Sequence, residues 1–395
     1  MNLYSISDKI VFKILQEINN GYLEIKKLDG ELIRFGNPKH SLKAYIKIKK
    51  PNFTFNLIKG GSIGFAESYM RDEFETNNLS NLIEITARNI KIIYKFSGLL
   101  DLPIINFFKN ALVKNTKSRS KENIAKHYDL GNEFFSLWLD KTLTYSSAIF
   151  EEKNQNLSDA QNNKYQKLIN LIKPKNGDKV LEIGCGWGGF AEYAAKSFGA
   201  KITGITLSQE QANFAKKRMY KKGLNELVDI QIIDYRDLKK KFDRIISIEM
   251  FEAVGEKYWP IFFSKLKSNL NNNGLIGMQL ISIKNELYNN YRNNSDFIQK
   301  YIFPGGFLPS VDALTKVTSD CGLKIFYEKS FSEDYAKTLS IWRSNFIKNW
   351  SNMPKNKKYD LKFKNMWEYY LAYCEAGFRS KNTNVHQITL KSLEP

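Results

Sequence analysis

Short apolar runs alternate with longer amphipathic segments through the middle of the chain. Val180–Ile183 is apolar apart from one acid and predicts a buried parallel strand. It leads into a glycine-rich turn at residues 184–189, and then into Phe190–Lys196, whose apolar spacing predicts a helix. A strand, a glycine turn and a helix make the βα unit typical of nucleotide-binding folds, because glycine permits a sharp turn and exposes bare backbone to a ligand.

Three later apolar runs repeat the strand pattern. They are Lys201–Leu207, Val228–Ile233 and Asp243–Ile248, and polar residues follow each of them. A helical segment at residues 258–270 and a turn at 271–274 then lead into a fifth strand, Leu275–Ile283. Strands joined by helices predict an α/β fold, a Rossmann-like sheet with helices on both faces and a ligand crevice at the carboxyl ends of its strands.

The end of the first of these later runs, Lys201–Leu207, bears on which nucleotide is bound. A nicotinamide-binding fold places an acid there to take the ribose hydroxyls. This chain has Thr206, Ser208 and Gln211 in that neighbourhood instead. An ordinary βα turn without a ligand is the alternative interpretation of the glycine turn.

The first 80 residues have a different pattern. A helical stretch, Ser7–Asn19, precedes two strand-like segments that flank a turn at Asp29-Gly30, which predicts a β-hairpin. Two further strand-like runs follow, Ala44–Ile48 and Phe53–Ile58. We therefore expect a small α+β domain at residues 1–80, a basic amphipathic connector at 81–123 and the α/β domain at 124–390.

Composition excludes several classes of protein. With 395 residues and 43% hydrophobic content, the chain has the size for two or three globular domains. No stretch reaches the roughly 18 apolar residues of a spanning helix, and the N-terminus does not resemble a signal peptide. The three cysteines have no metal spacing and fit a reducing cytoplasm, and the three histidines are far apart, so we expect no metal site.

The net charge of +19 calls for an acidic partner. We favour an anionic membrane surface over nucleic acid, because the chain shows no pattern typical of nucleic-acid-binding modules. Compositional drift toward lysine is an alternative source of the charge. In the connector, basic residues are interleaved with apolar ones, which suits either a membrane-interface segment or a core helix with a solvated face. We expect a cytoplasmic protein bound peripherally to the inner face of the membrane.

Several motifs in order resemble one family. G-C-G-W-G-G (184–189), T-L-S-Q-E-Q (206–211), D-Y-R-D-L (234–238) and M-F-E-A-V-G (250–255) resemble class I S-adenosylmethionine methyltransferases. More narrowly, they are similar to cyclopropane-fatty-acyl-phospholipid synthases and mycolic acid cyclopropane synthases. The motifs H-Y-D-L-G-N, L-T-Y-S-S-A, Y-I-F-P-G-G-F-L-P-S, D-Y and C-E-A-G-F, which begin at residues 127, 143, 301, 334 and 374, fit the same family.

The resemblance covers essentially the whole chain and implies an activity. The enzyme would transfer a methylene group from S-adenosylmethionine to the cis double bond of an unsaturated acyl chain in a membrane phospholipid, and form a cyclopropane fatty acid. The N-terminal domain would present the lipid or serve only as a scaffold. The alternative is a fatty-acyl C-methyltransferase that gives a methyl- or methylene-branched chain without ring closure. A small-molecule methyltransferase, a membrane-binding protein with a decayed enzyme core, and a homodimer also stay open.

The resemblance also implies catalytic residues. In this family a bound bicarbonate removes the proton that allows ring closure, and the matching positions here are Glu252, Tyr335, Gln279 and the backbone at Ser147 and Ile281. Many members carry cysteine in place of Ser147, and bacterial members often carry histidine in place of Gln279. Glutamine forms hydrogen bonds but does not titrate near neutral pH, so the last step and the product stay open.

The remaining candidates bind the cofactor. Glu182 is expected to support the glycine turn from below, and Tyr235 and Arg236 to flank the adenine. The residues expected to bind S-adenosylmethionine are Tyr145, Ser146, Glu182, Gly184, Gly186, Gly188, Thr206, Leu207, Gln211, Tyr235 and Arg236.

Overall fold

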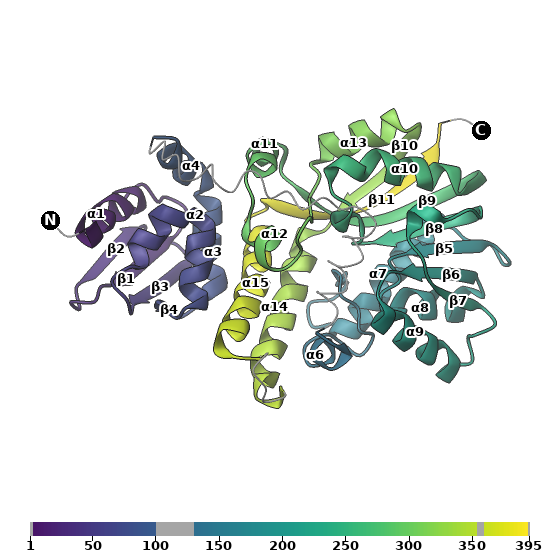
Figure 1. The fold of residues 1–395 in the computed structure, drawn as a ribbon, viewed down its shortest axis with the longest axis horizontal. Coiled ribbons are helices and arrows are strands. Elements are labelled where there is room, and N and C mark those ends of the chain that lie inside the picture. The colour runs from purple at the N-terminus through teal and green to yellow at the C-terminus, as the bar shows by residue number, and fades with distance from the viewer. Residues whose placement is uncertain (1–2, 100–129, 354–358, 394–395) are drawn as a thin grey trace.

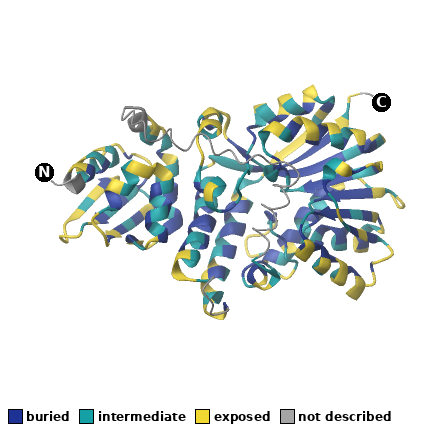
Figure 2. Ribbon diagram, in the orientation of Figure 1, coloured by how far each residue is buried: buried dark blue, intermediate teal, exposed yellow. Residues whose placement is uncertain are grey.

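The computed structural model describes residues 3–99, 130–353 and 359–393. They form a small N-terminal unit and a larger α/β unit, with the helices α14 (Ser332–Asn349) and α15 (Leu361–Arg379) between them (Figure 1). Buried residues line the strands and the inward helix faces of both units, and exposed residues lie on the outer faces (Figure 2).

The N-terminal unit is built on a small sheet. Within the described residues its strands follow the order β2-β1-β3-β4. β1 and β2 form the expected antiparallel hairpin around Asp29-Gly30, whereas β1 and β3 are parallel. The strands are Tyr22–Lys26 (β1), Leu32–Gly36 (β2), Lys43–Ile48 (β3) and Phe74–Thr76 (β4).

One expectation for this unit is wrong. Phe53–Ile58 is not a strand but the first part of helix α2, Phe53–Met70, which bends at Gly61, where φ is +53°. The alternation of apolar and polar residues in this run is typical of a strand, yet Phe53 is 2% exposed and Phe55 is 38% exposed. Side chains two residues apart therefore do not share a face here, as a strand would require.

Within the described residues, three more helices complete the unit: the first two pack on the sheet, and the third contacts those two helices. They are Leu3–Leu15 (α1), Leu79–Arg88 (α3) and Ile90–Leu99 (α4). The domain boundary expected at residue 80 falls inside α3, because the buried Leu82 and Ile85 of this helix pack into the N-terminal core. The rest of the expected connector after residue 99, and residues 127–129 of the histidine motif, lie outside the described residues.

The larger unit contains the expected Rossmann-like sheet. Across the described ranges its strand order is β10-β11-β9-β8-β5-β6-β7, with β5 to β9 parallel and β10 and β11 antiparallel to their neighbours. The strand order reverses between β5 and β8, which opens a crevice at their carboxyl ends. The strands are Lys179–Ile183 (β5), Lys201–Thr206 (β6), Val228–Ile232 (β7), Phe242–Ile248 (β8), Leu270–Ile283 (β9), Leu323–Ser330 (β10) and Thr383–Ser392 (β11).

Helices cover both faces of this sheet (Figure 1). α7, α8 and α9 bury one apolar face in one core, and α10 and α13 bury the opposite face in another. A short helix, α6, precedes them in the chain. The helices are Asn132–Ser136 (α6), Leu157–Ile172 (α7), Gly189–Phe198 (α8), Gln209–Lys221 (α9), Trp259–Ser268 (α10) and Val311–Asp320 (α13).

Two details of the sheet differ from the sequence expectation. The turn expected at residues 271–274 lies inside β9, where the pairing with β8 shifts register between Phe242 and Arg244 and Asn273 has a φ of +62°. The pattern also did not reveal β10 and β11. β11 is inserted between β9 and β10, so the last strand of the sheet in sequence lies in its interior.

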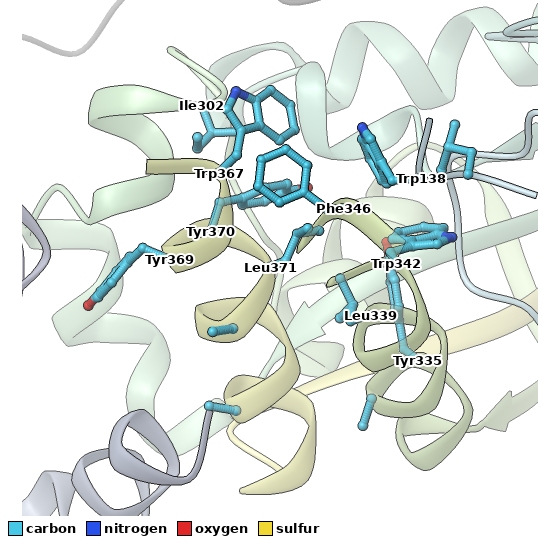
Figure 3. Packing of buried hydrophobic residues seen from close by; sticks show 14 of the residues in the cluster. Trp138, Ile302, Tyr335, Leu339, Trp342, Phe346, Trp367, Tyr369, Tyr370 and Leu371 are labelled. Carbon is cyan, nitrogen blue, oxygen red and sulfur yellow. The ribbon is translucent and has the colours of Figure 1, made fainter. Parts of the chain in front are cut away.

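A cluster of aromatic side chains fills the space around α14 and α15. Trp138, Trp342 and Trp367 are fully buried (Figure 3). The ring centroid of Trp138 lies 5.6 Å from that of Trp342 and 5.9 Å from that of Trp367. Trp342 of α14 and Trp367 of α15 thus belong to one hydrophobic core. This cluster gives the two long helices a rigid apolar support.

Buried charges connect the N-terminal unit to α15. Glu375 accepts a hydrogen bond from Ser80 of α3 at 2.7 Å and forms ion pairs with Arg343 and Arg379. Arg379 also pairs with Glu84 of α3 at 2.7 Å. The buried Glu375 carboxylate therefore connects α3 to α14 and α15. Breaking one of these contacts would be unfavourable, since it would leave a buried charge without a partner.

Candidate active site

A cavity of about 1170 Å³ lies at the carboxyl ends of the central strands. It begins at the glycine turn, passes between α15 and the insertion after β9, and continues into the N-terminal core. Its walls include Gly186 at one end, Tyr369 in the middle and Ile25 of β1 at the other end. A mostly apolar cavity with a few polar groups at one end is the usual form of a ligand site.

The glycine turn between β5 and α8 borders this cavity. Gly184, Gly186 and Gly188 have φ values of +82°, +53° and +81°, in the left-handed region that favours glycine. A Cβ on Gly184 would lie 2.7 Å from the Met250 side chain, whereas a Cβ on Gly186 would meet no atom within 4 Å. Space beside Gly186 is what a ligand lying against the turn requires.

Polar groups at the end of β6 face the same space. Thr206 donates a hydrogen bond from its hydroxyl to Gln211 Oε1 at 2.9 Å, and the Ser208 side chain caps the amino end of α9. Thr206, Leu207 and Gln211 line the cavity together with the glycine turn. The structure thus brings these expected cofactor residues together.

Tyr235 and Arg236 stand at the neighbouring strand end, after β7. Asp234 holds the Arg236 guanidinium at 2.5 Å, and that guanidinium lies over the Tyr235 ring at 5.4 Å from its centroid. Burial raises the pKa of Tyr235 to about 12. These residues line the cavity and provide a flat, amphipathic edge next to the glycine turn.

Glu182, Tyr145 and Ser146 also line the cavity. Lys164 donates a hydrogen bond to Ser146 Oγ at 2.7 Å, and burial lowers the pKa of this lysine to about 7. Burial raises the pKa of Glu182 to about 8. Tyr145 forms a hydroxyl–hydroxyl hydrogen bond with Tyr370 of α15 at 2.7 Å.

The expected catalytic residues converge on a residue that the sequence pattern did not single out, Glu249. Its Oε1 accepts hydrogen bonds from the Ser147 backbone at 2.9 Å and from Gln279 Nε2 at 2.7 Å. Its Oε2 accepts a hydrogen bond from the Tyr335 hydroxyl at 2.6 Å. Burial raises the pKa of Glu249, and these hydrogen bonds together with the nearby Lys164 oppose that rise.

Glu252 follows on the 3₁₀ turn Phe251–Ala253 and has fewer partners. Its Oε1 accepts a hydrogen bond from the Ile281 backbone at 2.5 Å, and its buried Oε2 has no hydrogen-bond partner among the described residues. Burial, and then the charge of Glu249, raise the pKa of Glu252 to about 8. A carboxyl group in these surroundings is protonated at neutral pH.

Gln279 and Ser147 lie behind Glu249. Neither lines the cavity, whereas Glu249, Glu252, Tyr335 and Ile281 do. The Gln279 amide also donates to the Ser147 carbonyl at 3.1 Å and accepts a hydrogen bond from Gln387 of β11 at 3.1 Å. These contacts fix the amide so that its nitrogen faces Glu249.

Two signals mark Glu249. It is an acid immediately after a buried strand, three residues before Glu252, at the edge where a ligand crevice is expected. In the structure its φ is +48°, a conformation that non-glycine residues rarely adopt. Backbone strain of this kind costs about 1–3 kcal/mol and is concentrated at functional sites.

The insertion after β9 closes one side of the cavity. It contains α11 (Asn285–Asn293) and α12 (Phe297–Tyr301), and Phe303 and Phe307 of the insertion line the cavity. Lys300 and Tyr301 bond to Glu67 of α2 at 2.7 and 2.5 Å. The insertion thus contacts the N-terminal unit.

Comparisons with known proteins agree with these motifs. The family described as mycolic acid cyclopropane synthetase matches residues 115–388. The chain is 37% identical to the tuberculostearic acid methyltransferase UfaA1 of Mycobacterium tuberculosis, over 84% of this chain and 79% of the relative. It is 35% identical to the cyclopropane-fatty-acyl-phospholipid synthase of Escherichia coli K12, over 88% of both chains.

Solved structures show the same fold. The cyclopropane synthase MmaA2 of Mycobacterium tuberculosis aligns with a TM-score of 0.64 at 27% identity, over 68% of this chain and 97% of the other. The mycolic acid cyclopropane synthase CmaA1, solved with S-adenosylhomocysteine (SAH) and CTAB, aligns with a TM-score of 0.62 at 28% identity, over 68% and 97%. In the described part of the chain, no helix has the length and apolar character needed to span a membrane.

Proposed function

Because the chain belongs to the mycolic acid cyclopropane synthetase family, and so to the S-adenosylmethionine-dependent methyltransferases, we propose that it transfers a methylene group to the cis double bond of an unsaturated phospholipid acyl chain. The product would be a cyclopropane fatty acid. The cyclopropane-fatty-acyl-phospholipid synthase named among its relatives supports this substrate.

The observation that carries the proposal is the continuous cavity. It joins the glycine turn, where a nucleotide cofactor fits, to an apolar region that reaches the N-terminal core. Its volume of about 1170 Å³ exceeds the roughly 300–1,000 Å³ typical of a site for one small ligand. A cofactor and a long acyl chain would together use such a space.

The residues present fit S-adenosylmethionine. The open space at Gly186, the polar groups of Thr206 and Gln211, and the edge formed by Tyr235 and Arg236 would hold it. When bound, this cofactor supplies an electrophilic methyl group on a positively charged sulfur.

The chain's own residues suit a reaction that passes through a cation on the lipid. The cavity wall is mainly apolar and keeps water from the reacting carbons. Tyr335 and Phe378 stack with ring centroids 4.3 Å apart and line the cavity, and aromatic faces stabilise a nearby cation. The expected bicarbonate does not fit, because the Gln279 amide, the Tyr335 hydroxyl and the Ser147 backbone N–H all bond to Glu249.

The lipid would come from a membrane. The net charge of +19 favours an anionic surface, and a peripheral position at the inner face of the membrane is part of the proposal. The N-terminal unit would then present the acyl chain through the part of the cavity lined by α2 and α3. A homodimer and a cytoplasmic location stay predictions.

A second product is supported by a specific observation. Gln279 stands where bacterial synthases often carry histidine, and a relative at 37% identity is named a tuberculostearic acid methyltransferase. The alternative function is therefore a fatty-acyl C-methyltransferase whose product is branched. A ring and a methylene branch have the same mass, so chromatographic position and double-bond reactivity distinguish them.

The test is fatty-acid analysis of cells that express the chain. Ala87 of α3 lines the cavity in its N-terminal part, so Ala87→Trp fills that part, and Ala87→Ser is the matched control. We expect ring-containing fatty acids from the wild type and from Ala87→Ser. We expect at least a tenfold loss of product from Ala87→Trp, with unchanged S-adenosylmethionine binding in calorimetry.

Each other outcome has a clear meaning. Branched chains in place of rings would favour the second function. A wild type that binds S-adenosylmethionine but leaves all lipids unchanged would contradict the proposed function. Full activity of Ala87→Trp would show that the acyl chain does not use the N-terminal part of the cavity.

A further inference from the structure

We propose that Glu249 is the general base of the reaction and replaces an external bicarbonate, so that turnover needs no dissolved bicarbonate. This inference rests on the proposed function, because it concerns the proton that leaves the transferred methyl group. It assigns a catalytic role to a residue outside the set that the family resemblance implies.

The hydrogen bonds around Glu249 carry the inference. The resemblance assigns Gln279, Tyr335 and the Ser147 backbone to an external carboxylate-like anion. In this structure all of them bond to the Glu249 carboxylate, at 2.7, 2.6 and 2.9 Å. The chain thus supplies a carboxylate at the point where its donors meet.

A second anion beside Glu249 would be unfavourable. The donors that would stabilise it are engaged, and the neighbouring Glu252 adds another carboxyl group rather than a cation. Like charges at short range in a buried site disfavour each other's ionised form. The site is therefore built for one negative charge, and Glu249 provides it.

The carboxyl groups of Glu249 and Glu252 differ in their hydrogen-bond partners, as two groups with different acid–base roles should. Burial raises the pKa of Glu249, but this carboxyl group accepts hydrogen bonds at both oxygens and lies near Lys164, and these contacts oppose that rise. Glu252 has one backbone donor and a buried oxygen without a partner in the described chain, which favours its protonated form. Environments that separate two carboxyl groups in this manner commonly assign them different roles.

Every bond formed or broken and the proton released in this reaction are accounted for without a further reactant. The π electrons of the alkene form a carbon–carbon bond to the methyl group, and the electrons of the sulfur–methyl bond leave with the sulfur. The lipid then carries the positive charge. Glu249 takes a proton from the transferred methyl group, and the electrons of that C–H bond close the ring.

The backbone conformation at Glu249 suggests a substitution that distinguishes an internal base from bicarbonate. Glu249→Gly removes the carboxylate. Because φ at this position is +48°, glycine also relieves backbone strain rather than adding it. The variant leaves space among the same donors for a bicarbonate ion. Glu249→Gln is the matched control, because it removes the charge but keeps the volume.

The experiment measures methyl transfer to vesicles of unsaturated phosphatidylglycerol in buffer stripped of carbon dioxide, with and without added bicarbonate. We expect the wild type to be equally active in both. General-base catalysis contributes about 10²–10⁴-fold, so both variants should lose at least 100-fold without bicarbonate. Bicarbonate should restore Glu249→Gly at least tenfold and leave Glu249→Gln inactive.

Two results would overturn the base assignment. One is a wild type whose activity disappears when bicarbonate is removed, and this readout needs no variant. The other is a folded Glu249→Gln, with normal S-adenosylmethionine binding, that keeps activity within threefold of the wild type. A wild type that binds the cofactor but modifies no lipid in either buffer would instead contradict the proposed function.

Discussion

Two glycines of the same turn should respond differently to alanine. Both have a positive φ, +82° at Gly184 and +53° at Gly186, so alanine at either position costs about 1–2 kcal/mol in backbone strain. At Gly184 the new Cβ would also lie 2.7 and 2.8 Å from Met250 side-chain atoms. Overpacking of this kind adds about 1–3 kcal/mol. We expect Gly184→Ala to lose about 2–5 kcal/mol of folding stability and Gly186→Ala about 1–2 kcal/mol.

Cofactor affinity should show the opposite order. The Cβ at Gly186 meets no protein atom within 4 Å, so the methyl group would occupy space that the cofactor needs. The assays are urea unfolding without cofactor and calorimetric titration with S-adenosylhomocysteine. We expect Gly186→Ala to weaken binding at least tenfold, and more than Gly184→Ala does. Equal destabilisation of both variants, with unchanged binding to Gly186→Ala, would refute the reasoning.

Three further predictions concern named contacts. Tyr335→Phe removes a hydrogen bond that lowers the pKa of Glu249, whose ionisable neighbours include Glu252 and Lys164. The acid limb of the pH–rate profile should therefore move to higher pH, whereas an equal loss of activity at every pH would indicate that Tyr335 has a purely structural role. Glu252 holds a proton up to about pH 8 in the folded protein but only up to about 4.5 in the unfolded chain, so folding stability should fall between these pH values in urea titrations. Glu252→Gln should make that fall smaller, leaving the part due to Glu182, and should stay active at pH 7. Glu375→Ala removes the ion pair of the part-buried Arg343, one of the two ion pairs of Arg379 and the hydrogen-bond acceptor of Ser80, and should cost about 3 kcal/mol in urea unfolding. The exposed control Glu333→Ala should change stability by less than about 0.5 kcal/mol.

The sequence predicted those parts of the fold that local patterns encode. The apolar run of β5, the glycines after it and the polar strand ends define the sheet and its crevice, and the structure confirms them. Phe53–Ile58 was misread because its alternation fits a strand, and only the packing of Phe53 and Phe55 reveals a helix. β11 was missed because its position depends on pairing with residues of β9 that lie 100 to 114 positions earlier in the chain.

The candidate site shows the same division. The motif positions Glu252, Tyr335 and Gln279 lie together in the structure, although their roles stay proposals. Glu249 could be named as a polar strand end, but not as the residue that they surround. That arrangement depends on contacts between segments up to 102 residues apart, which no local pattern specifies.

The position of β11 has a consequence for how the enzyme becomes active during synthesis. Within the described residues β10 pairs only with β11, and β11 carries Gln387, whose amide contacts both Gln279 and the Lys164 backbone. Ribosomes release a chain from its N-terminus, so earlier strands can begin to fold while β11 is still inside the exit tunnel. The Gln279 amide gains its hydrogen bond from Gln387 only when β11 enters the sheet. A nascent chain could therefore bind cofactor before it is competent to turn over.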